Sequence, residues 1–236
     1  MIASAARSDV SWQALSRGAE PLFPTFGDFL PPGTGGIGDT LLEDLWVTIQ
    51  ISLAGTMIGL VPAVVLGVLA AGNVVRAPRV ARFFRTVILL IRGIPELILA
   101  IVFVVVTGLG PVAGALALGI GSIGLLGKLV ADSLEEVEPG PARALLATGA
   151  RRPQIFFGAI LPRAWPAIVA HLLYQLDVNF RSATLLGIVG AGGLGYDLLN
   201  AARVLEFGVV TTVVLMVLAV VLLVEGLAVW LRKVYA

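Results

Sequence analysis

Two pairs of opposite charges stand in otherwise apolar stretches, and these four residues are the best suited to chemistry. Arg92 precedes Glu96 by four positions, and Asp177 precedes Arg181 by the same spacing. Side chains four residues apart share one face of a helix. Charges inside a membrane are energetically expensive, so they usually pair or face a water-filled cavity. The pattern supports two interpretations: self-neutralising pairs that fix helix packing, or an arginine that faces the path of an anionic substrate.

A glycine cluster follows the second charge pair. Gly190, Gly192 and Gly195 have the spacing GxGxxG, and Gly193 lies between them. A dinucleotide-binding fingerprint with that spacing requires a preceding β-strand and an acidic residue about 20 positions later. Here a long apolar stretch comes first. We therefore expect the glycines to form a tight turn and to let helices approach closely at the end of a membrane span.

The composition limits other chemistry. The chain has no cysteine and one histidine, which excludes disulfides and thiolate catalysis and disfavours a histidine-based metal centre. The sequence contains no GxxxxGK(S/T) loop, so we expect no ATP to bind this chain through one. No catalytic set of residues is evident either. We predict that the chain holds no metal and is not an enzyme.

The hydropathy of the chain indicates a membrane protein. Of its 236 residues, 58% are hydrophobic and 13% are charged, whereas about one quarter of the residues of a soluble domain are charged. The apolar residues fall in long uncharged runs, and about 20 residues suffice for a helix to cross a bilayer. We predict an all-α integral membrane protein with about five transmembrane helices, at residues 46–72, 86–107, 112–130, 164–189 and 207–231.

The arginines between these predicted helices indicate the orientation. The first connection carries four arginines and no acid, and further arginines lie within residues 131–163. Basic residues are enriched in cytoplasmic loops, so we predict an N-terminus outside the cytoplasm. Residues 1–44 would form an extracytoplasmic tail, either interfacial or disordered. Residues 45–236 would form the transmembrane domain, with a cytoplasmic loop at 131–163.

That cytoplasmic loop contains regularly placed helix breakers. Pro139 and Pro141 suit the first turn of a helix, and Gly149 can end that helix by adopting a positive φ. Pro153 can begin a second helix, and Pro162 can end it. The predicted product is a short helix–turn–helix, which serves either as a plain connector or as a docking surface for a partner.

The spacing of Ala144, Gly149 and Leu161-Pro162 resembles the "EAA" loop of binding-protein-dependent ABC transporter permeases. Longer stretches are similar to phosphonate-type (PhnE-like) permease subunits: RGIPEL at 92–97, LGKL at 126–129, EPGPARALLATGA at 138–150 and LYQLDVNFRSATLLGIVGAGGLG at 173–195. The resemblance runs from about residue 44 to the C-terminus. It implies the type I ABC importer permease (MetI-like) fold.

The resemblance also implies roles for particular residues. The loop would couple the chain to an ATPase through Arg143, Ala144, Gly149, Arg151, Arg152, Leu161 and Pro162. The glycines would contribute to an outer gate, formed by Gly190, Gly192, Gly193 and Gly195. This chain departs from the family pattern in having Arg143 where a glutamate is usual and Ala159 where a larger apolar residue is usual.

The resemblance further implies a permease subunit of an ATP-driven importer in the bacterial plasma (inner) membrane. Its cargo would be a phosphonate, phosphite or phosphate-type oxyanion. Its expected partners are a second permease subunit, the same or paralogous, two ATP-binding subunits, an extracytoplasmic substrate-binding protein and membrane lipid, but no nucleic acid. ATP and Mg would bind the ATPase, and this chain would carry no cofactor. The alternatives are import of methionine, another amino acid or an osmolyte, or an ion-coupled secondary carrier.

Overall fold

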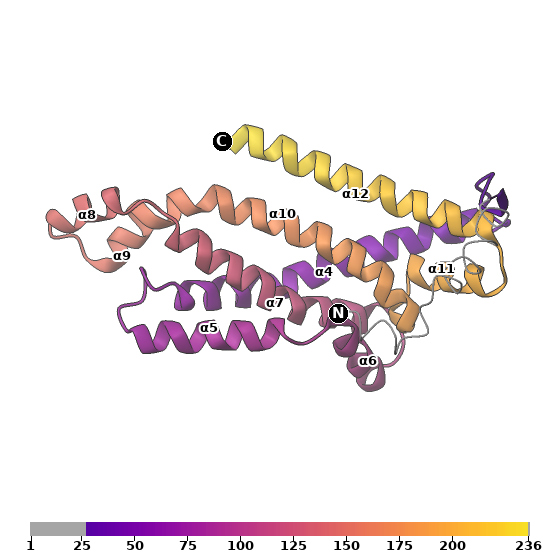
Figure 1. Cartoon of the computed structure of the whole chain (residues 1–236), viewed down its shortest axis with the longest axis horizontal. Coiled ribbons are helices and arrows are strands. Elements are labelled where there is room, and N and C mark those ends of the chain that lie inside the picture. Colours follow the sequence, from indigo (N-terminus) through magenta and orange to yellow (C-terminus); the bar gives the residue numbers. More distant parts are fainter. Residues whose placement is uncertain (1–26, 236) are drawn as a thin grey trace, which may run out of the picture.

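The computed structural model describes residues 27–235, and every regular element in that range is helical. Most of the predicted tail therefore lies outside the described residues. Two π-helical turns, Phe156–Ile160 and Gly187–Ala191, flank α10. The helices shown in Figure 1 are α4 (Gly38–Ala70), α5 (Pro78–Arg92), α6 (Glu96–Thr107), α7 (Pro111–Glu135), α8 (Pro139–Ala147), α9 (Arg152–Ile155), α10 (Leu161–Leu186), α11 (Leu194–Arg203) and α12 (Phe207–Tyr235).

Four helical segments of the described chain are long and apolar enough to cross a membrane, and α5 with α6 makes a fifth if the bent pair counts as one span. On that count, the prediction of about five spans is confirmed. The first helix begins at Gly38, earlier than the expected residue 46. The predicted outer loop up to Glu206 contains the helix α11. The side on which the N-terminus lies stays a prediction.

The second predicted span is not one continuous helix. α5 ends at Arg92, α6 begins at Glu96, and the two helices are bent by 75°. Pro95 causes the break, because it lacks an N–H and disfavours helical geometry in the residue before it. The expectation that Arg92 and Glu96 share one helical face is therefore wrong.

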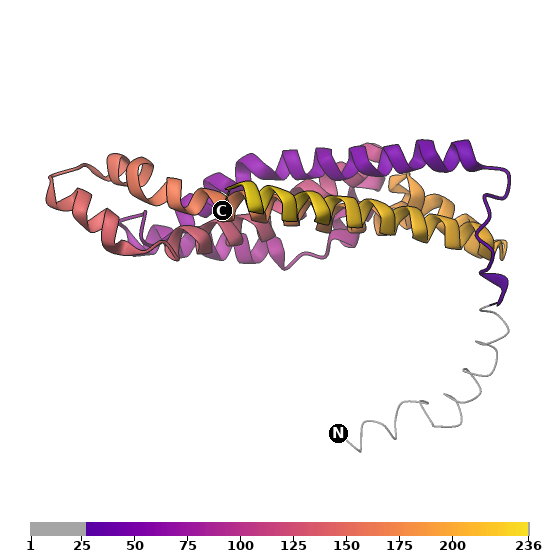
Figure 2. The same ribbon diagram turned by 90° about the horizontal axis from the view of Figure 1, so that it is seen from above.

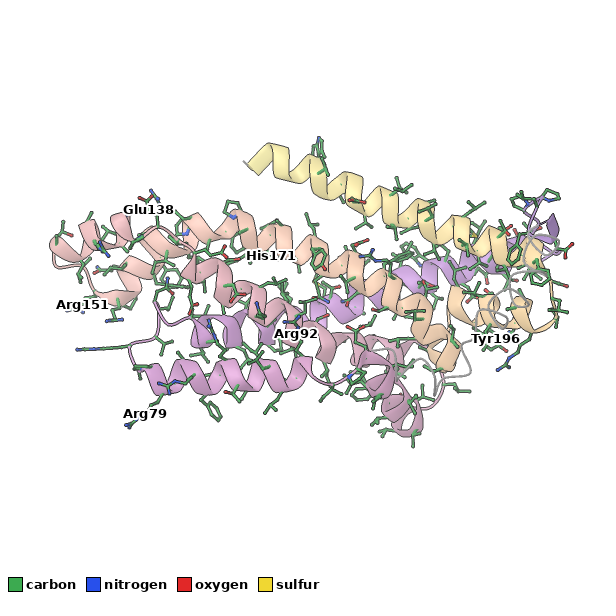
Figure 3. All side chains as sticks on the ribbon, in the orientation of Figure 1. Arg79, Arg92, Glu138, Arg151, His171 and Tyr196 are labelled. Atoms are coloured by element: carbon green, nitrogen blue, oxygen red, sulfur yellow. The ribbon has the colours of Figure 1, made fainter. Side chains whose placement is uncertain are left out.

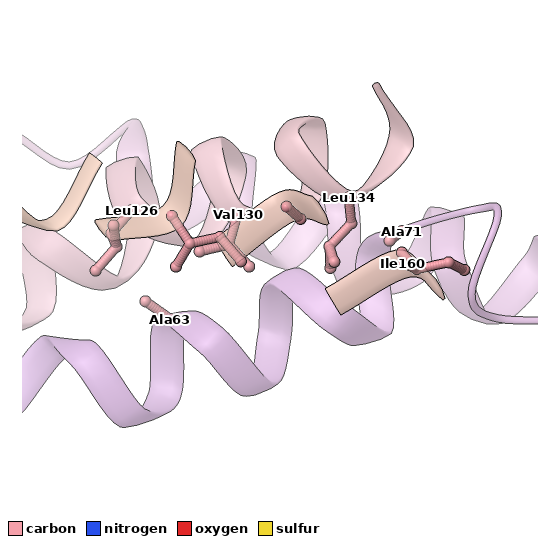
Figure 4. Packing of buried hydrophobic residues seen from close by; sticks show 8 residues of the cluster. Ala63, Ala71, Leu126, Val130, Leu134 and Ile160 are labelled. Atoms are coloured by element: carbon pink, nitrogen blue, oxygen red, sulfur yellow. The ribbon is translucent and has the colours of Figure 1, made fainter. Parts of the chain in front are cut away.

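Small residues bring α4 and α7 into close contact at the centre of the bundle. A Cβ at Gly55 would lie 2.6 Å from the Leu118 Cβ, and one at Gly59 would lie 2.5 Å from the Ser122 Cβ. Glycines of this kind allow membrane helices to pack backbone to backbone. Figure 4 shows the adjoining apolar cluster, in which Val130 of α7 packs near Ala63 of α4.

The two ends of this elongated bundle differ in composition. At the end that we call the basic end, α8 and α9 lie beside the α4–α5 connection at 71–77, as Figures 1 and 2 show. At the opposite end, the glycine end, α11 lies beside the starts of α4 and α12. Helices along the long axis join the two ends. The predicted docking loop and the predicted glycine turn therefore belong to one helical bundle.

Candidate functional site

The helix pair α8–α9 at the basic end has the predicted helix–turn–helix form. Gly149 follows α8 with a φ of 81°, and the Ala150 N–H donates to the Leu145 carbonyl at 3.2 Å. This arrangement is typical of a glycine that stops a helix. The backbone N–H of Arg151 donates to the Gln154 side chain at 2.7 Å and fixes the start of α9. The predicted stop at Gly149 is confirmed.

Pro162 does not end the second helix, contrary to the prediction. The helical segment continues from Arg152 to Ala191, a length of 40 residues. A π-helical turn precedes Pro162, and within it the Leu161 N–H donates to the Phe156 carbonyl. Pro162 is then in the second position of α10, where its missing N–H costs little. The helix pair is therefore joined to a membrane span without a break.

The residues expected to couple this loop to a partner are accessible, apart from Leu161, which is half-buried. Arg143 of α8 and Arg152 of α9 line the same cavity, whereas Arg151 does not. The exposed residues are Arg143, Ala144, Gly149, Arg151, Arg152 and Pro162. The structure thus offers an exposed surface in which arginines alternate with small residues.

One of the two charge pairs forms within α10. The Arg181 guanidinium donates to Asp177 Oδ2, while Asp177 Oδ1 is buried and has no partner among the described residues. The Arg181 side chain is 53% exposed and the Asp177 side chain 17%. Both original interpretations stand for this pair, because the arginine is both bonded and accessible.

The other pair does not form within the described chain. Glu96 lies against α7, where a Cβ at Gly121 would be 2.8 Å from its Oε1. Arg92 lies exposed half-way along the bundle (Figure 3), and its backbone packs on Gly124. The glycines of α7 therefore make room for the bend between α5 and α6. Arg92 is left available to other groups.

The glycine cluster turns the chain from α10 into α11. Gly190, Gly192 and Gly193 have φ values of 96°, 78° and 73°, which other residues adopt only with strain. The Gly190 carbonyl accepts a hydrogen bond from the Gly110 N–H at 2.9 Å. The cluster thus meets the α6–α7 connection, and the predicted tight turn is confirmed.

The same turn packs tightly on its neighbours. A Cβ at Gly193 would lie 2.4 Å from Thr48 Oγ1, and one at Gly195 would lie 1.9 Å from the Thr184 carbonyl. Thr48 also accepts a hydrogen bond from the Leu194 N–H at 2.9 Å. These contacts fix the glycine end to α4 and α10, as expected for glycines that allow close helix approach.

The sequence analysis missed a buried polar group at the junction of α4, α7 and α10. The Asn179 amide donates to Thr56 Oγ1 and to Ser122 Oγ, each at 2.8 Å. Its oxygen accepts a hydrogen bond from the Gln175 amide at 2.9 Å. All four residues are buried. The available signal was the four-residue spacing of Gln175 and Asn179 within an apolar stretch.

A second missed feature is a carboxyl pair at the glycine end. Asp197 of α11 is buried, and its Oδ2 has no partner among the described residues. Burial raises the pKa of Asp197 to about 7, helped by a side-chain hydrogen bond with Asp44 of α4 and by the charge of that residue. A nearby carboxylate disfavours the charged form of its neighbour. Asp197 is thus neutral over part of the physiological pH range.

We predict that Asp197 makes the stability of the protein depend on pH. A raised carboxyl pKa means that the folded state holds a proton which the unfolded state releases near its ordinary pKa of 3.8. The stabilising contribution is therefore complete below about pH 4 and is lost as the pH rises through about 7. Thermal unfolding in detergent at pH 5 and pH 8 should show a lower Tm at pH 8.

Asp197→Asn should reduce this difference, because asparagine stays neutral at both pH values. The exposed Asp39 in the first turn of α4 supplies the control, and Asp39→Asn should keep the wild-type pH dependence. An unchanged fall in Tm in the Asp197→Asn protein would contradict the interpretation that the folded protein holds a proton on Asp197.

Taken together, these features define a multi-pass membrane component of a transport system. The chain belongs to the family described as binding-protein-dependent transport system inner membrane component, whose model matches residues 63–234. Members of this family are transport permeases rather than enzymes. The chain is thus an inner membrane protein of the permease class.

Two similar proteins are phosphorus oxyanion permeases by name. The chain is 44% identical over 215 residues to the phosphate-import permease protein PhnE of Mycolicibacterium smegmatis, covering 90% of this chain and 40% of that protein. It is 36% identical over 207 residues to the phosphite transport system permease protein PtxC of Stutzerimonas stutzeri, covering 88% of this chain and 75% of that protein. The chain therefore spans less than half the length of the first relative.

Among solved structures, the chain resembles one of the MetNI methionine ABC transporter in an inward-facing conformation. The TM-score is 0.78 at 23% sequence identity, and the match covers 86% of this chain and 100% of the other. Similarity at this level of identity concerns the fold. The predicted all-α, MetI-like fold of a type I importer permease is confirmed.

Proposed function

We propose that this chain is the permease subunit of an ATP-driven importer of small phosphorus oxyanions: phosphonate, phosphite or phosphate. The observation that carries the proposal is the similarity, over about nine tenths of this chain, to permeases named for phosphate and phosphite. A permease named for D-methionine transport in Haemophilus influenzae matches 75% of the chain, but at 26% identity. The higher identity of the long matches to phosphate and phosphite permeases favours an oxyanion over methionine, another amino acid or an osmolyte.

The proposed partners follow from the family. A binding-protein-dependent system implies an extracytoplasmic substrate-binding protein. We propose a pair of permeases, the same or paralogous, with two ATP-binding subunits that hold ATP and Mg. In this arrangement the N-terminus and residues 1–44 lie outside the cytoplasm, and residues 45–236 form the transmembrane domain. Transport without any ATPase subunit would instead indicate an ion-coupled secondary carrier.

The helical run from α9 through α10 supports a mechanism for coupling. α9 forms one end of that run. The glycine turn follows its other end, where Gly190 has a non-helical φ of 96°. A movement imposed on α9 by an ATPase is transmitted along this run to the proposed outer gate. Such coupling requires that the ATPase bind two permease states with different affinities.

The test is to purify the chain with its expressed partners and to measure oxyanion uptake in vesicles. Co-purification of an ATPase, together with ATP-dependent uptake of phosphate, phosphite or a phosphonate, would support the proposal. Failure of every ATPase expressed with the chain to co-purify would refute the assignment of partners. Binding measurements on the substrate-binding protein would then distinguish an oxyanion cargo from methionine.

We predict that Arg181→Gln lowers oxyanion uptake about tenfold, a change equivalent to about 1.4 kcal/mol. Its guanidinium is accessible within a span, so we propose that it faces the path of the anion, and that Arg92 does so at the bend. Arg92→Gln should act in the same direction. Wild-type uptake by assembled transporters of both variants would reject the path role.

Asp177→Asn separates this role from simple packing. If the pair only fixes the helices, Asp177→Asn should reduce assembly as much as Arg181→Gln does. If Arg181 attracts the anion, the Asp177→Asn transporter should assemble and retain uptake. Arg203→Gln, at the exposed end of α11, controls for loss of a positive charge elsewhere.

A further inference from the structure

A cavity of about 370 Å³ lies at the basic end, between the helix pair and the ends of the spans. Its lining includes Asn73, just after α4, and Glu135, the last residue of α7. It also includes Ile160, which directly precedes α10. The cavity is therefore beside the ends of three candidate spans: α4, α7 and the segment that contains α10. Its size is that of sites for small organic ligands.

Two carboxylates, Glu135 and Glu138, also line this cavity, and each has a basic partner that is not part of the wall. Glu135 accepts hydrogen bonds from the Gly72 N–H at 2.7 Å and from the Arg85 guanidinium at 2.8 Å. The side chain of Glu138 is 81% exposed and lies 3.9 Å from Arg163. Neither acid forms an ion pair with an arginine of the cavity wall within the described residues.

Two arginines in the wall remain without an acidic partner. Arg143 comes from α8 and Arg152 from α9, and neither forms an ion pair within the described part of the chain. The rest of the wall is largely apolar, with Val74, Leu146 and Phe156 among its residues. Two free cations beside an apolar surface suit an anion that carries an apolar body.

The surroundings indicate where such an anion comes from. Trp165, near the start of α10, is 54% exposed, and exposed tryptophans mark the headgroup level of membranes. Arg79 and Arg82 of α5 are exposed at the same end, and Figure 3 shows Arg79, Glu138 and Arg151 together there. Basic residues beside cytoplasmic helix ends attract anionic lipids, and basic pockets between such helices bind their headgroups.

We propose that this cavity binds the headgroup of an anionic phospholipid. The phosphate lies between Arg143 and Arg152, and the beginning of an acyl chain lies on the apolar wall. Because the two arginines belong to different helices of the pair, and other parts of the wall belong to the α4–α5 connection and the end of α7, the lipid holds the helix pair against the core. The position of the helix pair then depends on the anionic lipid content of the membrane.

The test uses the full chain in detergent, with thermal unfolding as the readout. Phosphatidylglycerol should raise the apparent Tm, by roughly 5 °C or more at about 100-fold its Kd, and phosphatidylcholine should not. Arg143→Gln and Arg152→Gln should each remove this rise. Arg151→Gln is the matched control, because Arg151 is exposed beside the cavity without lining it. Arg143→Lys should keep part of the rise, since it keeps the charge.

Three results would overturn the proposal. An equal rise with phosphatidylcholine would show that the headgroup charge is irrelevant. An equal rise with glycerol 3-phosphate would assign the cavity to a soluble anion instead of a lipid. Equal responses of the three glutamine variants would place the lipid elsewhere. Each comparison is made on the chain alone, so it is independent of the proposed transport function.

Discussion

Gly195→Ala is expected to prevent the protein from folding stably. The new Cβ would lie 1.9 Å from the Thr184 carbonyl and 2.9 Å from the Gly187 Cα. Both are backbone atoms, so no side-chain rotation relieves the overlap, and α11 must move away from α10. Overpacking usually costs about 1–3 kcal/mol. Here we expect roughly 3 kcal/mol or more, because α11 is also bonded to α4 through Leu194 and Thr48.

The measurement is the yield of monodisperse protein after detergent extraction, together with its apparent Tm. Gly226→Ala is the matched control, because Gly226 lies in α12 with no atom within 4 Å of its Cβ position. Alanine in an exposed helix is about 1 kcal/mol more favourable than glycine, so this control should be at least as stable as wild type. A Gly195→Ala protein with wild-type yield and Tm would show that the α10–α11 turn is looser than the structure indicates.

The positions of the spans could be predicted from the sequence because hydropathy alone determines them. Uncharged runs longer than a bilayer leave few alternatives. Hydropathy does not indicate the break between α5 and α6. Some membrane helices tolerate a proline such as Pro95, and others end at one. The angle between the two halves depends on Gly121 and Gly124 of α7, which are distant in sequence from the break.

Gly149 and Pro162 show the same limit in the helix pair. Glycine at the end of a short helix has a local reason to adopt a positive φ, so the stop was predictable. Proline in a helix interior removes one backbone hydrogen bond and often ends or kinks the helix, yet Pro62 and Pro166 lie within helices here. The π-helical turn at Phe156–Ile160 changes the hydrogen-bond register, and no residue pattern in the sequence indicated it.

Asp197 and Asp44 were not predictable as a pair, because 152 residues lie between them along the chain and only tertiary packing brings them together. In the candidate site, residues close in sequence were placed well where the helix is continuous, as with Asp177 and Arg181. They were not placed well across the break at Pro95, as with Arg92 and Glu96. Residues joined through three helices, as at Asn179, required the structure. The difference follows from the range of the interactions, since helix-face rules concern neighbours four positions apart.

Asn179→Leu is expected to destabilise the protein by roughly 3 kcal/mol. The substitution removes the only partner that the structure gives Ser122 Oγ and the acceptor for the Gln175 amide. Both groups stay buried, with relative exposure of 0% for each residue. An unsatisfied buried polar group costs about 1–3 kcal/mol. Thr56 loses less, because its hydroxyl still donates to the Ser52 carbonyl at 2.7 Å.

The double variant Gln175→Leu/Asn179→Leu makes the test specific. In Asn179→Leu, the Gln175 amide N–H loses its acceptor. The second substitution removes that N–H and also the Gln175 Oε1, which has no partner within the described residues. The double variant should therefore be more stable than Asn179→Leu alone, by about 1–2 kcal/mol, a coupling of the size expected for contacting residues. Gln175→Leu alone should have a smaller effect than Asn179→Leu, because Asn179 keeps both of its hydroxyl partners. Apparent Tm values for the wild type and the three variants complete the double-mutant cycle. Additive effects would show that the polar group does not act as one unit at the junction of α4, α7 and α10.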